Sequence, residues 1–312
     1  MIESTLTELL SQEYPEQREL CGKWLRTGEL VMCYAPRGTG KSLWAASLAY
    51  AVASGLPFLG SNPACPARVL YIESEMPDRL TAKRFSSLEY RAAAAPLPET
   101  LHILRRGPDG NLPNLSLPDG QAFYAERAKF FDLIVIDNLT TIAPPLDNRD
   151  DDTKAWYRIK PFIYSLRNSD KCVLIIHHAG KSGAQLGTSL RENDMDVILR
   201  LTTPDYDSET NRLRFYLDFD KARDLEPNDR AGWYMEYENI AGSPMWTYKP
   251  AKEFRANEIR RLATKISNKL ILAQMLGCPT WLVHQVLAEK VKELEDPDYF
   301  NGDWNDDKEP LF

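Results

Sequence analysis

A glycine-rich stretch near the N-terminus has the residue types that bind phosphate. Residues 35–42 read Ala-Pro-Arg-Gly-Thr-Gly-Lys-Ser, between an apolar run at 29–35 and an Ala-rich helical stretch at 43–53. Backbone N–H groups of such a turn, at the start of a helix, point at phosphate oxygens. Lys41 would reach the β- and γ-phosphates and Ser42 would hold Mg²⁺. The alternative is a chance glycine turn before a helix. The predicted loop residues are Arg37, Gly38, Thr39, Gly40, Lys41 and Ser42.

Acidic residues end two further apolar runs. Asp137 ends the run 131–137, where a carboxylate at the C-terminal edge of a parallel strand can orient Mg²⁺. Its structural alternative is capping of the next turn. Glu73 and Glu75 come at the end of the run 68–73, and one of them would orient or deprotonate a water that attacks the γ-phosphate. Glu75 lies past the tip of the strand, so we favour Glu75 over Glu73, with a solvated loop acid as the alternative.

The apolar runs predict the elements that position these residues. Short continuous apolar runs separated by helical stretches are typical of a parallel sheet covered on both faces. From about residue 197 the pattern changes to alternation, and we expect antiparallel additions at a sheet edge over 197–201, 212–220 and 233–238. The sequence therefore predicts an α/β fold with a mainly parallel central sheet, antiparallel edge strands and a small helical C-terminal region.

Four parts are expected along the chain. They are an N-terminal helical arm at 1–28, an ATPase core at 29–250, a helical region at 251–294 and an acidic flexible tail at 295–312. In the helical region, two short amphipathic helices joined through a Gly are similar to a helix-turn-helix. A plain helical cap or an oligomerisation element is the alternative. Eight Lys and Arg against four Asp and Glu make this region positive.

Composition excludes several classes of protein. The 38 Lys and Arg against 45 Asp and Glu give a net charge of −7, so any binding of nucleic acid must be local. No uncharged apolar run approaches the length of a transmembrane helix, and the N-terminus has no basic start of a secretory signal. Five scattered cysteines without a CxxC pair argue against disulfides and zinc. We expect a cytoplasmic protein with no membrane partner.

The motifs together resemble the RecA-type hexameric ATPases, and within them the RepA-like, DnaB-related replicative helicases, AAA-family ATPases of mobile elements. The resemblance spans residues 24 to about 240. It is carried by APRGTGKS at 35–42, YIESEMPDRL at 71–80 with Arg84 following, LIVIDN at 133–138, IIHHAGKSGAQLGTSLRENDMDVILRL at 175–201 and DKARD at 220–224. It implies a RecA-like P-loop NTPase fold, ATP and Mg²⁺ as cofactors, and a homo-oligomeric ring, expected to be a hexamer. The Glu-Met pair after the second strand is similar to the helicase pattern in which that Glu is catalytic, which supports Glu75.

The resemblance also implies roles for residues beyond the phosphate loop. His178, after the strand that follows Asp137, matches the position that senses the γ-phosphate, with a satisfied structural histidine as the alternative. The Gly/Ser/Thr-rich loop 180–193 would line the centre of the ring and contact DNA through Lys181 and Arg191, unless it is only a flexible polar loop. The pair Lys221 and Arg223, after an edge strand, would reach the ATP of a neighbouring subunit, with a solvated cationic pair as the alternative.

The expected function is an ATP-dependent motor on single-stranded DNA in the replication of a plasmid, phage or prophage. Initiator, primase or single-strand-binding proteins are the further partners that this setting implies. The main alternative is a RecA/RadA-like or regulatory DNA-binding ATPase that does not unwind. Two others are a non-enzymatic DNA-binding module that works through 259–294, and a small-molecule kinase. Glu75 and the Lys221/Arg223 pair argue against the kinase.

Overall fold

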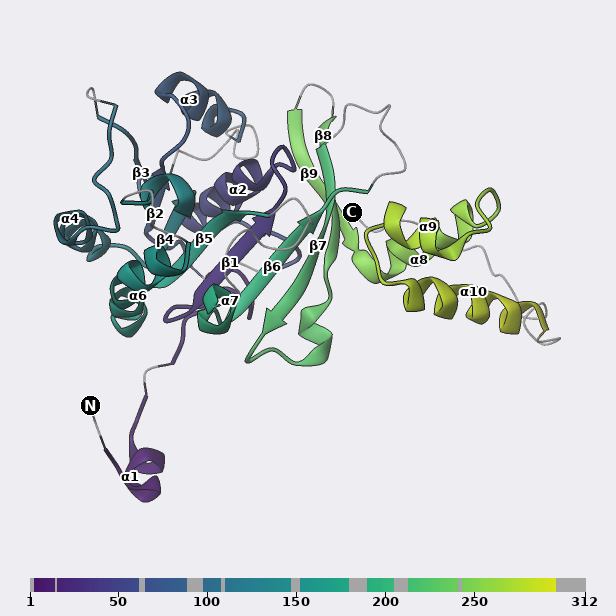
Figure 1. The fold of residues 1–312 in the computed structure, drawn as a ribbon, viewed down its shortest axis with the longest axis horizontal. Helices are drawn as coiled ribbons and strands as arrows, with labels where there is room; N and C mark the ends of the chain where they lie inside the picture. The colour runs from purple at the N-terminus through teal and green to yellow at the C-terminus, as the bar shows by residue number, and fades with distance from the viewer. Residues whose placement is uncertain are drawn as a thin grey trace.

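The computed structural model describes residues 3–14, 16–61, 65–88, 98–107, 110–146, 152–179, 190–204, 213–240 and 243–295. Within these ranges the chain forms a nine-stranded sheet with the order β3-β2-β4-β5-β1-β6-β7-β8-β9 and helices on both faces (Figure 1). Neighbouring strands from β3 to β6 are parallel, and those from β6 to β9 are antiparallel. The predicted α/β fold with a mainly parallel sheet is confirmed.

The predicted strand segments at 29–35, 68–73, 131–137, 197–201, 212–220 and 233–238 each form a strand within a few residues of the expected bounds, whereas β9 was not predicted. In chain order the strands are β1 Leu30–Ala35, β2 Val69–Glu73, β3 Leu101–Leu104, β4 Leu133–Asp137, β5 Cys172–His178, β6 Val197–Thr202, β7 Leu213–Ala222, β8 Trp233–Ile240 and β9 Ser243–Pro250. Every residue of β1, β2 and β4 is buried, because helices cover both faces of the sheet there.

The direction of β6 corrects one expectation. We expected residues 197–201 to form an antiparallel addition, but β6 runs parallel to β1, with Val31 in register with Val197. β1 lies between β5 and β6 in the sheet, and all three strands run in the same direction, so the connection from β5 to β6 is a parallel crossover. The antiparallel part of the sheet therefore begins only at β7, which pairs with β6 on one side and β8 on the other.

Helices cover the sheet in two layers. α2 packs on one face, where Trp44 lies in the larger core, and α4 and α6 pack on the other, where Tyr124 and Trp156 lie in the second core (Figure 1). The helices before the C-terminal region are α1 Leu6–Ser11, α2 Lys41–Ser54, α3 Asp78–Ser86, α4 Pro118–Ala128, α5 Leu139–Ile142, α6 Asp152–Asn168 and α7 Leu190–Asp194, and a 3₁₀ turn, η2, spans Pro227–Arg230.

The N-terminal arm is shorter than expected. Leu20, Trp24 and Leu25 are buried in the larger core, and the Trp24 ring stacks on Trp44 at 6.3 Å between centroids. The core therefore begins before the expected boundary at residue 28. α1 alone stands away from the body (Figure 1) and buries no residue. Its exposed Leu6, Leu9 and Leu10 share one helical face by their spacing.

Three helices, α8 Ala251–Leu262, α9 Lys269–Met275 and α10 Thr280–Glu295, form a C-terminal module beyond β7 to β9 (Figure 1). The module has its own hydrophobic core, around Ile259, Leu272 and Val283. A bidentate ion pair attaches it to the sheet, since Arg255 donates to both carboxylate oxygens of Asp218 on β7, at 3.1 and 2.8 Å. In the described ranges no single helix is long and apolar enough to cross a membrane. The predicted acidic tail lies almost wholly outside the described residues.

Candidate functional site

The predicted phosphate loop joins the end of β1 to the start of α2. Gly38 and Gly40 have φ of 80° and 97°, values that glycine adopts without strain. A Cβ on Gly40 would also lie 2.7 Å from Cδ1 of Leu213 on β7. Lys41 Nζ donates to the carbonyl oxygens of Ala35 and Pro36, both at 2.8 Å, and burial lowers the pKa of Lys41. The loop therefore curves around an ammonium group at a helix N-terminus, where a phosphate chain binds.

Asp137 lies directly beside this loop. Ser42 Oγ donates to Asp137 Oδ1 at 3.1 Å, and the Tyr71 hydroxyl donates to Oδ2 at 2.5 Å. Asp137 is 1% exposed, and burial raises its pKa despite these two hydrogen bonds. A hydroxyl and a carboxylate facing each other are the hard oxygen ligands that Mg²⁺ takes together with phosphates, so the pair fits a Mg-nucleotide. Among the described residues, no group of three His, Cys, Asp or Glu is placed to hold a metal ion by itself.

The two acids after β2 have different surroundings. Glu73 is 1% exposed, and its Oε1 accepts from the backbone N–H groups of Glu75 and Met76 at 3.0 and 2.9 Å. Its Oε2 accepts from Arg84 at 3.1 Å, and burial raises the pKa of Glu73. Glu73 thereby holds the turn that presents Glu75. Glu75 is exposed, and it is the acid whose carboxylate a water can approach.

Asn138 connects Glu75 to His178. Its Oδ1 accepts from the backbone N–H and the hydroxyl of Thr141, at 3.0 and 3.1 Å, and so caps α5. Its Nδ2 is therefore the donor, to Glu75 Oε2 at 2.7 Å and toward His178 Nε2 at 3.2 Å. His178 Nε2 must be an acceptor, which requires a neutral ring. Burial, and then the charge of Lys41, lower the pKa of His178 in agreement with this arrangement.

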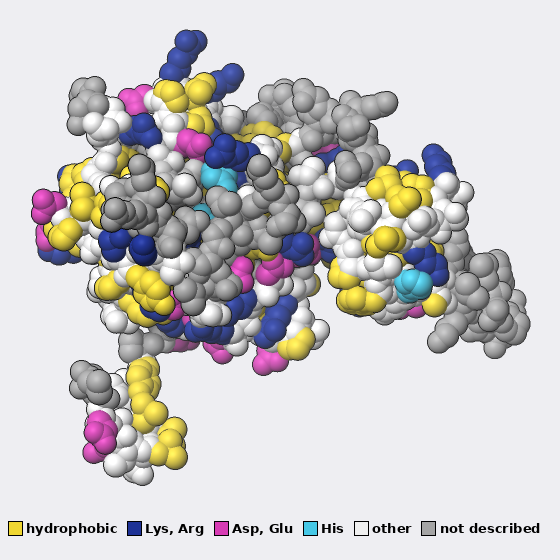
Figure 2. Space-filling view, viewed as in Figure 1, with side chains coloured by type: hydrophobic (Ala, Val, Ile, Leu, Met, Phe, Trp, Pro, Cys, Tyr) yellow, Lys and Arg dark blue, Asp and Glu magenta, His cyan; other side chains and the backbone are white. Residues whose placement is uncertain are grey.

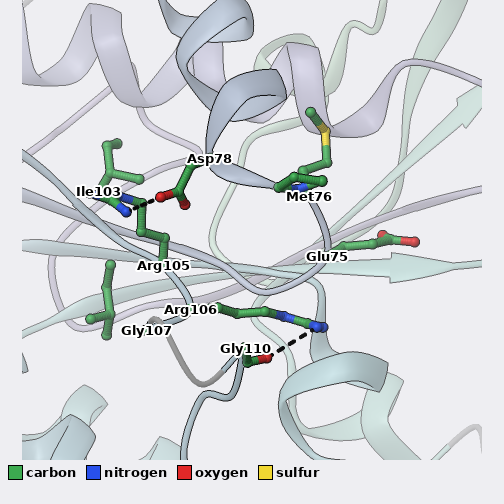
Figure 3. A pocket seen from close by; sticks show the side chains of 10 residues that line it. Glu75, Met76, Asp78, Ile103, Arg105, Arg106, Gly107 and Gly110 are labelled. Carbon is green, nitrogen blue, oxygen red and sulfur yellow. Dashed lines mark hydrogen bonds and ion pairs between the residues drawn. The ribbon is translucent and has the colours of Figure 1, made fainter.

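A cavity of about 770 Å³ opens next to Glu75, between the turn after β2 and the end of β3 (Figure 3). Two cations line it and both are engaged. Arg105 pairs with Asp78, and Arg106 donates to the carbonyl oxygens of Ser74, at 3.0 and 2.6 Å, and of Gly110 at 3.4 Å. Arg106 thus ties the loop after β3 to the turn that carries Glu75.

Sequence reasoning assigned no role to Asn138, Tyr71 or Arg84, although all three lie within or beside the motifs. Two signals were present. Asn is a strong N-cap residue and Asn138 directly follows Asp137. Tyr71 and Glu73, two positions apart, lie on the same face of β2, and Glu73 is in register with Asp137, so both side chains are expected near Asp137.

Arg191 corrects the expectation of a DNA contact at that position. It is 4% exposed, and its Nη1 lies 2.9 Å from Nε2 of the buried His177. A side chain held there cannot reach a DNA backbone, and Arg191 instead fixes α7 to the end of β5. Lys181, the other predicted DNA contact, lies outside the described residues.

Lys221 and Arg223 face α7 together. Lys221 Nζ donates to the Glu192 and Asn193 carbonyl oxygens at 2.5 and 3.2 Å. Arg223 donates to the same Asn193 carbonyl and to Asp196, the latter at 3.4 Å. The sequence placed the pair after an edge strand, but β7 is an interior strand.

The pair also lies level with the beginning of β1, whereas the phosphate loop of the same subunit follows the end of β1. Ala222, between the two cations, is in register with Val197 at the start of β6, and Val197 with Val31. Ala35 lies four positions after Val31 on β1, which is about 13 Å at the rise of a strand. The cations therefore cannot act on the nucleotide of their own subunit from this position.

A phosphate loop after β1, an acid at the end of β4 and a sheet of this order define a RecA-like P-loop ATPase domain. The chain belongs to the AAA domain family, whose sequence profile matches residues 1–184. No curated protein matches the sequence.

Solved structures are similar to this chain at low sequence identity. The ATPase domain of G40P has a TM-score of 0.50 at 15% identity, covering 70% of this chain and 85% of its own. The KaiC-like protein PH0186 from Pyrococcus horikoshii OT3 has a TM-score of 0.49 at 16% identity and covers 72% of this chain and 91% of its own. The flagellar accessory protein FlaH from Methanocaldococcus jannaschii also has a TM-score of 0.49, at 14% identity, with coverage of 72% and 92%.

Proposed function

We propose that this protein hydrolyses Mg-ATP as a ring-forming motor on single-stranded DNA, a RepA-like replicative helicase of a plasmid, phage or prophage. The observation that carries the proposal is the position of Lys221 and Arg223. They lie together, partly exposed, at the end of the sheet that is remote from their own phosphate loop. A cation pair so placed can serve a triphosphate only if that triphosphate is bound by another subunit, and closed rings bring such surfaces together.

Within one subunit, the residues around the phosphate loop divide the work of hydrolysis. The loop residues 37–42 hold the phosphates through backbone N–H groups, and Lys41 neutralises charge at the γ-phosphate. Mg²⁺, when bound with the nucleotide at Ser42 and Asp137, supplies charge neutralisation between the β- and γ-phosphates. These roles use the oxygen and nitrogen atoms that the fold gathers between β1, β4 and α2.

Glu75 accepts the proton of the attacking water. The water oxygen bonds to the γ-phosphorus, the bond from that phosphorus to the β–γ bridging oxygen breaks, and ADP and phosphate leave. Asn138 holds the Glu75 carboxylate through its Nδ2 group. The same Nδ2 group lies 3.2 Å from His178 Nε2, so a γ-phosphate that displaces His178 also changes the surroundings of Glu75.

Contacts at α7 support a path from this site to the subunit interface. His177, next to His178 on β5, contacts Arg191 of α7. The carbonyl groups of Glu192 and Asn193 at the other end of α7 accept from Lys221 and Arg223. A movement at the end of β5 therefore reaches the cation pair through one short helix. Lys181, in the segment between β5 and α7, remains the proposed contact to single-stranded DNA.

The exposed apolar face of α1 supports self-association. Leu6, Leu9 and Leu10 lie on a helix without a buried residue, so no described part of its own subunit covers them. A second copy of the chain would cover such a face, as expected for a homo-oligomeric ring, which we propose is a hexamer.

The test is the rate of phosphate release with and without single-stranded DNA, for the parent chain and for Arg223→Ala. We expect stimulation of the parent by DNA and a loss of about 10³-fold in the variant, since a cation supplied by a neighbour is worth this much in phosphoryl transfer. Arg127→Ala, an exposed arginine on α4, is the matched control and should retain full activity. Parental rates in Arg223→Ala would refute the shared site. ATP turnover without strand displacement of a forked duplex would instead favour the RecA/RadA-like or regulatory alternative.

A further inference from the structure

The C-terminal module has the geometry of a helix-turn-helix. α9 and α10 are bent by 113° relative to each other and joined by the four residues 276–279. Gly277 in this turn has φ of 59°, and a Cβ there would lie 2.4 Å from Cγ2 of Thr202. Helix-turn-helix motifs join two helices at about 90–120° through a turn of three or four residues that often contains Gly. α8 packs behind the pair, as Ile259, Leu276 and Val283 share one core.

The charge of this module differs from that of the rest of the chain. Residues 259–288 contain Arg260, Arg261, Lys265 and Lys269 and no Asp or Glu. At the average of the whole chain, a stretch of this length would contain about four acidic residues. Over the whole module, residues 251–295, eight Lys and Arg stand against five Glu, which makes it positive within a protein of net charge −7 and therefore complementary to a polyanion. Figure 2 shows basic, histidine and hydrophobic side chains together on the visible face of the module.

The first half of α10 presents polar and aromatic side chains to solvent. Trp281 is 64% exposed, and His284 and Gln285 are exposed as well, whereas Val283 and Val286 face the core. Residues 281, 284 and 285 lie on one face of the helix by their spacing. Lys269 Nζ, at the start of α9, lies 3.3 Å from His284 Nδ1, so a cation borders this face.

We propose that α9 and α10 bind duplex DNA, with the N-terminal half of α10 in the major groove, a function separate from the proposed motor on single strands. Gln285, whose Nε2 donates to Glu289 Oε1 at 2.9 Å in the free protein, exchanges this exposed contact for a base edge, since Gln pairs through two hydrogen bonds with adenine. Lys269 contacts a phosphate, and Trp281 packs on the backbone at the edge of the groove. The exposed Leu270 and Ile271 on α9 would suit a protein partner instead. The net positive charge of the module and the polar face of α10 favour DNA.

The test uses the full-length protein without nucleotide and a pool of random 25-base-pair duplexes labelled with a fluorophore. Selection should enrich one sequence, and Gln285→Ala should weaken its binding about tenfold and relax the preference at one base pair. Lys269→Ala should reduce the slope of log affinity against log salt by about 1 for any duplex. Lys129→Ala, an exposed lysine on the core, should change neither quantity.

Two further measurements separate the competing outcomes. Stimulation of the ATPase by single-stranded DNA should be unchanged in Gln285→Ala. Loss of duplex binding with unchanged stimulation would show that the duplex site on α9 and α10 is separate from the site that binds single-stranded DNA. Selection without an enriched sequence, together with parental duplex affinity in Gln285→Ala and Lys269→Ala, would overturn the proposal. If Leu270→Ser also lowers the oligomeric state in sedimentation, the surface is a protein contact. All three side chains are outside the core, and unchanged circular dichroism melting verifies that the variants fold.

Discussion

Asn138 offers a sharp test of how the candidate site is assembled, because its Oδ1 and Nδ2 atoms make hydrogen bonds with different parts of the site. Oδ1 caps α5 by accepting from Thr141, and Nδ2 donates to Glu75 and toward His178. Asn138→Ser keeps an N-cap oxygen and removes the Nδ2 donor. Asn138→Ala removes both. Comparison of the two variants therefore separates the cap from the bridge.

The magnitude follows from the bond that is lost. The 2.7 Å contact between Nδ2 and Glu75 Oε2 is a hydrogen bond to a charged group, worth about 1.5–3 kcal/mol. If the bond positions Glu75 in the transition state, kcat falls by about 10- to 150-fold in both variants. The cap is worth about 1 kcal/mol, so Asn138→Ala should melt about 2 °C below Asn138→Ser.

The assay is steady-state phosphate release at saturating ATP and single-stranded DNA, with circular dichroism melting of the same samples. Both variants should show the same loss of kcat but different melting temperatures. Parental kcat in Asn138→Ser would refute the bridge. A loss of kcat that follows the melting temperature, small in Ser and large in Ala, would show that Asn138 acts through the α5 cap alone.

Three further outcomes are expected. Mixing Arg223→Ala with Glu75→Ala subunits at equal ratio should restore turnover to about a quarter of the parental rate, because random assembly leaves that fraction of shared sites intact, and no rescue at any ratio contradicts sharing. The pKa of His178 lies below its ordinary 6.5, so the neutral ring favoured by the fold is lost only as pH falls through that lowered value. An acid limb in kcat below pH 6.5 should therefore disappear in His178→Gln, and its persistence there would assign the limb to another group. The pKa of Asp137 is raised by burial, so its contribution to stability is lost as pH rises through the raised value. At pH 7.5 without nucleotide, Asp137→Asn should melt about 2 °C higher than the parent while losing ATPase activity, and a lower melting temperature would contradict this.

The local sequence pattern was enough to predict a feature when one continuous segment contains all the residues that define it. The phosphate loop is contiguous, and β1, β2, β4 and β5 are continuous apolar runs because both of their faces are covered. Local patterns did not predict elements whose formation depends on contacts with other parts of the chain. α4 begins at Pro118, within the stretch 107–120 whose many Gly, Pro and Asn residues are typical of a loop, and β9 has too few apolar residues for the pattern of a buried strand.

The sequence alone determined that this chain holds a phosphate loop at a helix N-terminus, with an acid at the end of a buried parallel strand, since both depend on residues adjacent in the chain. Only the tertiary structure decided which acid is exposed, because Glu73 is engaged by two N–H groups and by Arg84 from another element. It likewise buried Arg191 against His177 and placed Asn138 between Glu75 and His178. These pairings join side chains up to 63 positions apart, and no local periodicity encodes contacts at that separation.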